Sequence, residues 1–180
     1  NILTLCIMKN VIITGTSSGL GFELVKKFNA ENYNIISLSR SPCLIKSNLV
    51  EHFNFDITDS KSISELQKLI QSKYKTIDIL INNAGMLINK PFVELSKEEF
   101  ISVYDVNFFG VIELIREILP FLKSKSQIIN ISSIGGINGT SKFKGLSAYS
   151  SSKGALNILT EVLAEEFKEN GPIINSLCLG

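Results

Sequence analysis

Apolar residues follow two different periods along this chain. Short runs rich in isoleucine and valine predict strands that are covered on both faces, and these runs span 10–14, 34–38, 51–55, 77–81, 127–131 and 173–177. Longer segments carry apolar residues at spacings of three and four, which predict helices at about 20–29, 62–72, 97–119 and 148–168. Strands that alternate with helices indicate one doubly wound α/β domain over residues 1–180, whose ligands bind at the carboxyl ends of the strands.

The longest predicted helix has sequence signals at both ends. Ser96 and Glu99 fit a capping box, in which the Ser96 hydroxyl accepts a hydrogen bond from the Glu99 amide and the Glu99 carboxylate accepts one from the Ser96 amide. Pro120 follows this segment and is expected to end it, because proline lacks the amide hydrogen that a helix interior needs.

The composition is that of a single globular domain and argues against several classes of protein. With 180 residues, of which 44% are hydrophobic, the chain can bury a sizeable core. Eighteen Lys and Arg residues balance seventeen Asp and Glu residues without a basic run, which argues against a nucleic-acid partner. No apolar run approaches the ~18 residues of a membrane span, so a cytoplasmic location is expected. Residues 1–7 lie ahead of Met8 and the first strand and are interpreted as an extra N-terminal segment.

Cysteine and histidine are too sparse to indicate a metal site or a catalytic triad. Cys6, Cys43 and Cys178 are widely spaced and form no C-x-x-C pair, so neither a disulfide framework nor a zinc site is expected. His52 is the only histidine, and no G-x-S-x-G motif accompanies it, which argues against a Ser-His-Asp hydrolase.

The first predicted strand leads into a glycine-rich turn that opens the first helix. Glycines let a backbone approach a pyrophosphate closely, and a helix N-terminus offers unpaired N–H groups to an anion. The spacing G-x-x-x-G-x-G matches neither G-x-G-x-x-G nor a Walker A motif, so an ordinary glycine-rich turn is the alternative. The strand before and the helix after favour a dinucleotide site, made here by Gly15, Thr16, Ser17, Ser18, Gly19, Leu20 and Gly21.

The ends of the next three strands add candidate contacts to the same ligand. Arg40 follows the second strand where an acid would bind the ribose of NAD, so it favours the 2′-phosphate of NADP, with a solvated loop arginine as the alternative. After the third strand comes Asp56-Ile57-Thr58-Asp59; these residues either cap the next helix, or the Asp56 carboxylate accepts from an adenine amino group. Small and amide residues that allow a close backbone approach, or simply make a turn, end the fourth strand: Asn82, Asn83, Ala84 and Gly85.

Tyr149 and Lys153 are four residues apart and share one face of the last predicted helix. An ammonium beside a phenol favours the phenolate, which lowers the tyrosine pKa and makes proton transfer feasible near neutral pH. The same spacing is also common on solvated helix faces, so the pair alone does not establish catalysis.

Taken together, these motifs resemble the classical short-chain dehydrogenase/reductase family. The resemblance rests on Thr14-Gly15-x-x-x-Gly19-x-Gly21, Asn82-Asn83-Ala84-Gly85, Ser132-Ser133 and Tyr149-x-x-x-Lys153, which occur in this order over most of the chain. It implies a three-layer Rossmann-type parallel sheet with strand order 3-2-1-4-5-6. It also implies an NADP(H)-dependent oxidoreductase that transfers a hydride to or from a carbonyl or alcohol substrate.

The resemblance also implies roles for four residues. Tyr149 is similar to the family's general acid or base, and Lys153 to the lysine that binds the nicotinamide ribose and lowers the tyrosine pKa. Ser133, which Ser132 precedes, resembles the serine that orients the carbonyl. Asn107 resembles the asparagine that holds a proton-relay water, although its sequence alone suggests only a structural polar residue within a helix.

Departures from the family pattern leave alternatives open. The segment 134–147 is longer than in most members, and Leu179 stands where the family has a proline before a substrate lid and a seventh strand. Either the protein lacks the lid and the last strand, or the sequence is a truncated form of a longer protein. A catalytically silent NADP(H)-binding regulatory or scaffold protein is therefore the alternative function. A homodimer or homotetramer is expected, with a helical interface that includes apolar positions interpreted as outward, namely Val111, Leu114, Ile158 and Leu163.

Overall fold

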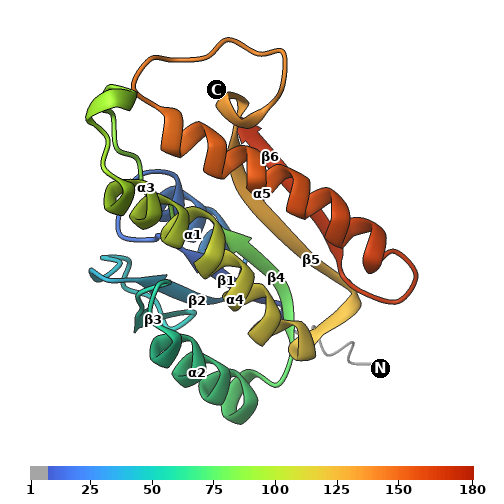
Figure 1. Cartoon of the computed structure of the whole chain (residues 1–180). Coiled ribbons are helices and arrows are strands. Elements are labelled where there is room, and N and C mark those ends of the chain that lie inside the picture. Colours follow the sequence, from blue (N-terminus) through green and yellow to red (C-terminus); the bar gives the residue numbers. More distant parts are fainter. Residues whose placement is uncertain (1–7) are drawn as a thin grey trace, which may run out of the picture.

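Six parallel strands form one sheet in the computed structural model of the protein, in the order β3-β2-β1-β4-β5-β6 (Figure 1). The strands are β1 (Asn10–Thr14), β2 (Asn34–Ser39), β3 (Val50–Asn54), β4 (Ile77–Asn82), β5 (Leu122–Ser133) and β6 (Ile173–Leu179). The predicted strands and their order are confirmed. The structure describes residues 8–180, so the predictions for Cys6 and for the segment 1–7 concern residues outside the described part.

Helices cover both faces of the sheet, as expected from strands that are apolar on both sides. The helices are α1 (Gly19–Ala30), α2 (Ser60–Leu69), α3 (Lys97–Tyr104), α4 (Gly110–Ile118) and α5 (Ser147–Glu166). One core lies between the sheet and α2, α4 and α5, and includes Ile12 of β1. The second core lies between the sheet and α1, and includes Val11 and Ile13. Neighbouring residues of β1 therefore point to opposite layers.

The segment 97–119 is not the single regular helix that its periodicity predicts. The Ser96–Glu99 capping box is present at its start. A π-helical segment, η3 (Asp105–Phe109), then separates α3 from α4, and a short 3₁₀ turn, η4 (Leu119–Phe121), holds Pro120 at the end. The break widens the helix where Asn107 is buried, which is typical of π-helical segments at functional positions.

The prediction that Val111 and Leu114 face outward is wrong. Both are buried in the first core, with relative exposures of 1% and 0%. They belong to a stripe on α4 that continues through Ile115 and Ile118, and this stripe packs against the sheet and α2. Periodicity identifies such a stripe but does not say which neighbour covers it. Ile158 on α5 is exposed, as predicted.

Short additional turns complete the fold around the strand ends. These are η1 (Ile70–Tyr74) after α2, η2 (Phe92–Glu94) before α3, and η5 (Ile134–Gly136) directly after β5. β6 is the last strand at its edge of the sheet, and the side chains of Ile173 and Leu177 are exposed on it.

Candidate functional site: a pocket at the strand ends and a nearby Tyr–Lys pair

A pocket of about 530 Å³ lies at the carboxyl ends of β1, β2, β3 and β4. Its volume is within the range of small-molecule and cofactor sites. Most residues predicted to bind the cofactor line this pocket: Gly15, Ser17, Ser18, Arg40, Asp56, Ile57, Asn83, Ala84 and Gly85. The motifs come together because all the strands are parallel, so their carboxyl ends meet at one edge of the sheet.

The glycine-rich turn after β1 packs closely against the turn after β4. Gly15 has φ +71°, and a Cβ atom added to it would lie 2.9 Å from Cα of Ala84 in the neighbouring β4 turn. Ser18 precedes α1 as its N-cap but makes no capping hydrogen bond with its side chain. The amides at the start of this 12-residue helix therefore remain available to an anionic group, as a dinucleotide pyrophosphate requires.

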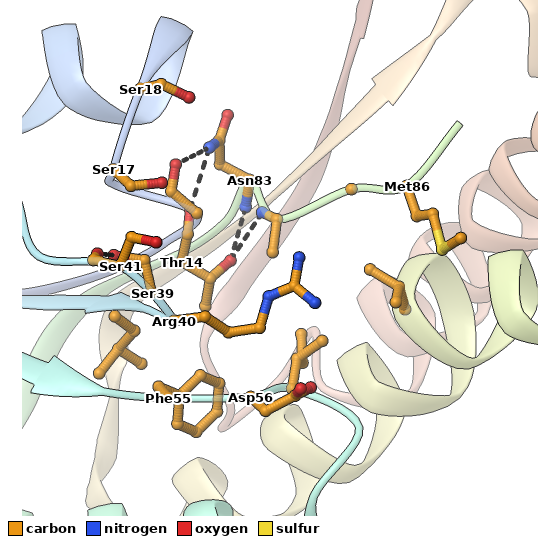
Figure 2. Close-up of a pocket in the computed structure, with 16 residues that line it drawn as sticks. Thr14, Ser17, Ser18, Ser39, Arg40, Ser41, Phe55, Asp56, Asn83 and Met86 are labelled. Atoms are coloured by element: carbon orange, nitrogen blue, oxygen red, sulfur yellow. Dashed lines mark hydrogen bonds between the residues drawn. The ribbon is translucent and has the colours of Figure 1, made fainter. Parts of the chain in front are cut away.

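Thr14 and Asn83 lock the β1 turn to the β4 turn (Figure 2). The Thr14 hydroxyl oxygen accepts hydrogen bonds from the amides of Asn83 and Ala84, both at 2.9 Å. In return, Nδ2 of Asn83 donates to the carbonyl oxygens of Thr14 at 3.0 Å and Gly15 at 3.2 Å. Asn83 thus holds the two turns of the pocket wall together, a role that its position in a turn did not reveal.

Arg40 extends into the pocket from the end of β2, above Phe55 and Asp56 from the end of β3 (Figure 2). Its side chain is exposed, and no ion pair within residues 8–180 involves it. The guanidinium therefore remains available to a ligand phosphate. Asp56 does not cap α2; it accepts from the amide and hydroxyl of Thr58, while Asp59 is the N-cap.

Some predicted contacts lie outside the pocket wall, and some wall residues were not predicted. Thr16 is fully buried and turned away, and Gly19, Leu20 and Gly21 shape the turn and α1 without lining the pocket. The unpredicted lining residues come from strand ends and from the π-helical segment: Thr14, Leu38, Ser39, Ser41, Phe55, Met86 and Val106. Except for Met86 and Val106, these residues lie at the ends of predicted strands, and this position could have identified them as pocket residues.

Tyr149 and Lys153 lie in the first turns of α5 and come together as the i,i+4 spacing predicts. Nζ of Lys153 lies 5.9 Å from the centroid of the Tyr149 ring. The same nitrogen donates to the carbonyl oxygen of Ile131 in β5 at 2.8 Å. Lys153 is only 4% exposed, and this burial lowers its pKa from 10.5 to about 8.

Ser133 and its neighbour Ser132 have different surroundings. Ser132 is buried, and its hydroxyl donates to the carbonyl oxygen of Lys153 at 3.3 Å. Ser133 is partly exposed and accepts from the amide of Gly135 at 3.2 Å, which leaves its own hydroxyl hydrogen available. The turn after Ser133 touches α5, because a Cβ added to Gly136 would lie 2.6 Å from the amide nitrogen of Gly154. The extra length of the segment 134–147 therefore does not separate this turn from α5.

Asn107 joins the π-helical segment to the β4 turn and to α5. Its Oδ1 accepts from the amide of Met86 at 2.7 Å, and its Nδ2 donates to the carbonyl oxygen of Met86 at 2.9 Å. Nδ2 also donates to the hydroxyl of Ser152 at 3.0 Å. Both amide hydrogens of Asn107 are therefore used within the protein.

Gly85 connects the pocket with the Tyr149–Lys153 pair. It lines the pocket at the end of β4. A Cβ atom added to it would lie 3.6 Å from Oδ1 of Asn107 and 3.8 Å from Nζ of Lys153. The Gly85 end of the pocket therefore lies close to the buried ammonium of Lys153.

The depressed pKa of Lys153 predicts how stability changes with pH. Because the fold favours the neutral amine, the buried charge destabilises the protein fully below about pH 8, and this cost is relieved as pH rises toward the unfolded value of 10.5. The wild type should therefore become more stable with rising pH, whereas Lys153→Met should not share this change. Between about pH 7 and pH 10, the free energy of unfolding of the wild type should rise by about 2 kcal/mol relative to that of Lys153→Met. Chemical denaturation measures this difference. Lys68→Met, at an exposed helix position, is the control whose difference from wild type should stay constant; a constant difference for Lys153→Met would contradict the prediction.

Other kinds of site are not indicated in the described part of the chain. Within residues 8–180, no group of three or more His, Cys, Asp and Glu side chains is arranged to hold a metal ion. No helix in this part combines the length and the apolar character needed to cross a bilayer.

Comparisons with known proteins identify a family that matches most of this chain. The family model described as short chain dehydrogenase matches residues 9–180. A 3-ketodihydrosphingosine reductase of Bacteroides thetaiotaomicron is 37% identical over 161 residues, which are 87% of this chain and 57% of that protein. The chain thus spans little more than half the length of this relative.

Solved structures share the fold and differ in their cofactor. The structure of ElxO with NADP bound has a TM-score of 0.87 and 30% identity, and covers 96% of this chain and 73% of its own. A short-chain dehydrogenase of Leptospira borgpetersenii with bound NAD+ has a TM-score of 0.85 and 28% identity, covering 96% of this chain and 71% of its own. With the pocket, the Tyr–Lys pair and the family match in agreement, the chain belongs to the short-chain dehydrogenase family.

Proposed function

We propose that the protein transfers a hydride between NADP(H) and a carbonyl or alcohol substrate. The observation that carries this proposal is the position of Gly85, which lines the cofactor pocket and lies beside both Lys153 and Asn107. The uncapped start of α1 and the close approach of Gly15 fit the phosphates of a dinucleotide. The bound nicotinamide would supply or accept the hydride.

The residues around Tyr149 would manage the charge on the substrate oxygen. In the reductive direction, the Tyr149 hydroxyl donates its proton to that oxygen as a general acid. The Lys153 ammonium, close to the ring, stabilises the phenolate that remains. The hydroxyl hydrogen of Ser133 is available to donate to the same oxygen. Negative charge is therefore partnered throughout the step.

Asn107 is proposed to help return a proton to this site. Its side chain amide is occupied by Met86 and Ser152, so it cannot offer a further hydrogen to a water molecule. A relay water near Lys153 would instead bind a main-chain carbonyl in the wider turn of η3. In this proposal the Asn107 side chain holds η3 in place, and the backbone holds the water.

The preference for NADP(H) is supported by the end of β2. Arg40 reaches the pocket there, and its neighbours Ser39 and Ser41 are not acidic. Structures similar to this chain bind either NAD or NADP, so the preference is a property to be tested on this protein.

The experiment that tests the function uses purified protein and a panel of ketones, including long-chain 3-keto compounds of the kind named for the Bacteroides relative. We expect saturable oxidation of NADPH with at least one ketone, and NADPH should raise the melting temperature more than NADH at equal concentration. Binding of NADPH without oxidation across the panel would support the silent scaffold instead. Equal stabilisation by NADH would contradict the role of Arg40.

The proposal also includes an oligomeric state and a cellular location. Exposed apolar side chains on α3, η3 and α5, which pack side by side, support a homodimer or homotetramer through this face; they are Ile101, Phe109, Ile158 and Val162. Sedimentation as a monomer at micromolar concentration would contradict it. Within residues 8–180, Cys43 and Cys178 form no disulfide, which suits the reducing conditions of the predicted cytoplasmic location.

A further inference from the structure

We propose that three buried hydroxyl groups, those of Ser37, Thr16 and Ser39, form a directed hydrogen-bond chain that fixes Arg40 in place and thereby sets the preference for NADPH over NADH. This inference rests on the proposed function, because it concerns how the same pocket distinguishes two forms of its cofactor. Thr16 acts here as a positioning residue, since it is fully buried and does not line the pocket.

The backbone places the three hydroxyls side by side. β1 and β2 are paired in parallel, and the amide of Gly15 continues this ladder beyond β1 by donating to the carbonyl oxygen of Leu38 at 2.7 Å. Thr16 follows directly and enters the space between Ser37 and Ser39, which share one face of β2. Its Oγ1 lies 2.7 Å from Oγ of Ser37 and 2.9 Å from Oγ of Ser39.

The direction of the hydrogen bonds follows from the last acceptor. Oγ of Ser39 lies 2.7 Å from the carbonyl oxygen of Ser41, which can only accept, so the Ser39 hydroxyl must donate its single hydrogen there. Ser39 must then accept from Thr16, and Thr16 must accept from Ser37. The order Ser37, Thr16, Ser39, Ser41 is thus the only one that uses every hydroxyl hydrogen once.

This chain ends on the turn that carries Arg40. Ser39 and Ser41 flank Arg40, and their hydrogen bond closes the turn around it. The Arg40 side chain makes no ion pair within the described residues 8–180, so its starting position depends on the backbone of this turn. The pocket wall beside it includes Ser17 and Ser41, whose hydroxyls make no hydrogen bond within the same part of the chain. Arg40 with these hydroxyls forms a set of donors suited to a phosphate dianion.

Loss of the chain should affect the two cofactors differently. Both NADPH and NADH require the glycine-rich turn and the start of α1, but only NADPH carries the 2′-phosphate that Arg40 would bind. A displaced Arg40 therefore weakens the binding of NADPH more than the binding of NADH. A general loosening of the turn around Thr16 would weaken both cofactors by the same factor.

The test compares dissociation constants for NADPH and NADH, measured by calorimetry on the whole protein, so no turnover is needed. Thr16→Val keeps the shape of the side chain but removes its hydroxyl, and we expect it to lower the NADPH-to-NADH affinity ratio about tenfold. Thr16→Ser restores the hydroxyl and should restore most of the ratio. In an Arg40→Ala background, where the ratio is already reduced, Thr16→Val should cause no further loss, because both changes act on one contact.

Thr160→Val is the matched control. Thr160 is also a buried threonine, and it bonds to Leu156 and Asn130 on α5 and β5. It should lower stability without changing the ratio. Two results would overturn this inference but leave the proposed function standing. One is an equal loss of NADPH and NADH affinity in Thr16→Val; the other is a fall in the affinity ratio in the Arg40→Ala background as large as the fall in wild type. A wild-type protein without NADPH preference would overturn both the cofactor proposal and the inference that rests on it.

Discussion

Replacing Tyr149 with phenylalanine is expected to reduce turnover about 10³-fold while NADPH still binds. The substitution removes one oxygen atom and leaves the ring that lies beside Lys153 in place. Without the hydroxyl, no proton donor remains on this ring, and general acid–base help of this kind is typically worth about 10²–10⁴-fold. The ketone assay gives kcat, and calorimetry gives the NADPH affinity of the same preparation.

Tyr33→Phe provides the control for this prediction. Tyr33 packs edge to face on Phe28, between α1 and β2. Its loss of a hydroxyl should leave kcat within about twofold of wild type, because surface and packing changes away from a site have small effects. Turnover by Tyr149→Phe near the wild-type rate would reject Tyr149 as the acid, whatever its effect on binding.

The sheet could be predicted from the sequence because its strands are buried on both faces. β1 is Val-Ile-Ile between polar residues, and both neighbouring layers need apolar side chains from it, so the run is continuous and its ends are sharp. The site could be located for a related reason: motifs at the ends of parallel strands share one edge. Gly15, Asn83 and Arg40 meet in one pocket although they are far apart along the chain.

The start of β5 could not be predicted because it does not have the composition of a strand. Its first residues include the exposed Lys123, Ser124 and Lys125, and its pairing with β4 shifts register between Ile77 and Ile79. Ser126 stabilises this irregular part, since its hydroxyl accepts from the amide of Lys123 and donates to the carbonyl oxygen of Ile77. Tertiary hydrogen bonds, rather than an apolar period, determine this segment.

The orientation of individual side chains was equally beyond the sequence. Thr16 lies within the glycine-rich turn predicted to bind phosphate, yet its hydroxyl points into the protein because Ser37 and Ser39 provide partners there. Asn107 lies within an apolar helical pattern, and the π-helical turn that buries it depends on its bonds to Met86. Both outcomes depend on partners that are more than twenty residues away.

Gly21→Ala is expected to be the most damaging single-methyl change in the glycine-rich turn and the start of α1. A Cβ atom at Gly21 would lie 2.1 Å from the carbonyl oxygen of Gly15 and 2.6 Å from Nδ2 of Asn83. Both contacts are far inside van der Waals distance, and the first involves backbone that cannot rotate away. Relief requires the turn at Gly15 to move from β4, which also breaks the hydrogen bonds that Asn83 makes to it. We expect a loss of at least about 3 kcal/mol in the free energy of unfolding.

Gly19→Ala separates this clash from the general effect of adding a methyl group to the turn. Gly19 has φ +55°, but nothing lies within 4 Å of its added Cβ, so only backbone strain of about 1–2 kcal/mol is expected. Chemical denaturation of the two variants should therefore rank Gly21→Ala well below Gly19→Ala, and equal losses would contradict the clash. In the proposed function the displaced turn would hold the pyrophosphate and not the 2′-phosphate. Gly21→Ala should therefore weaken the binding of NADPH and of NADH by the same factor, unlike a change at Thr16.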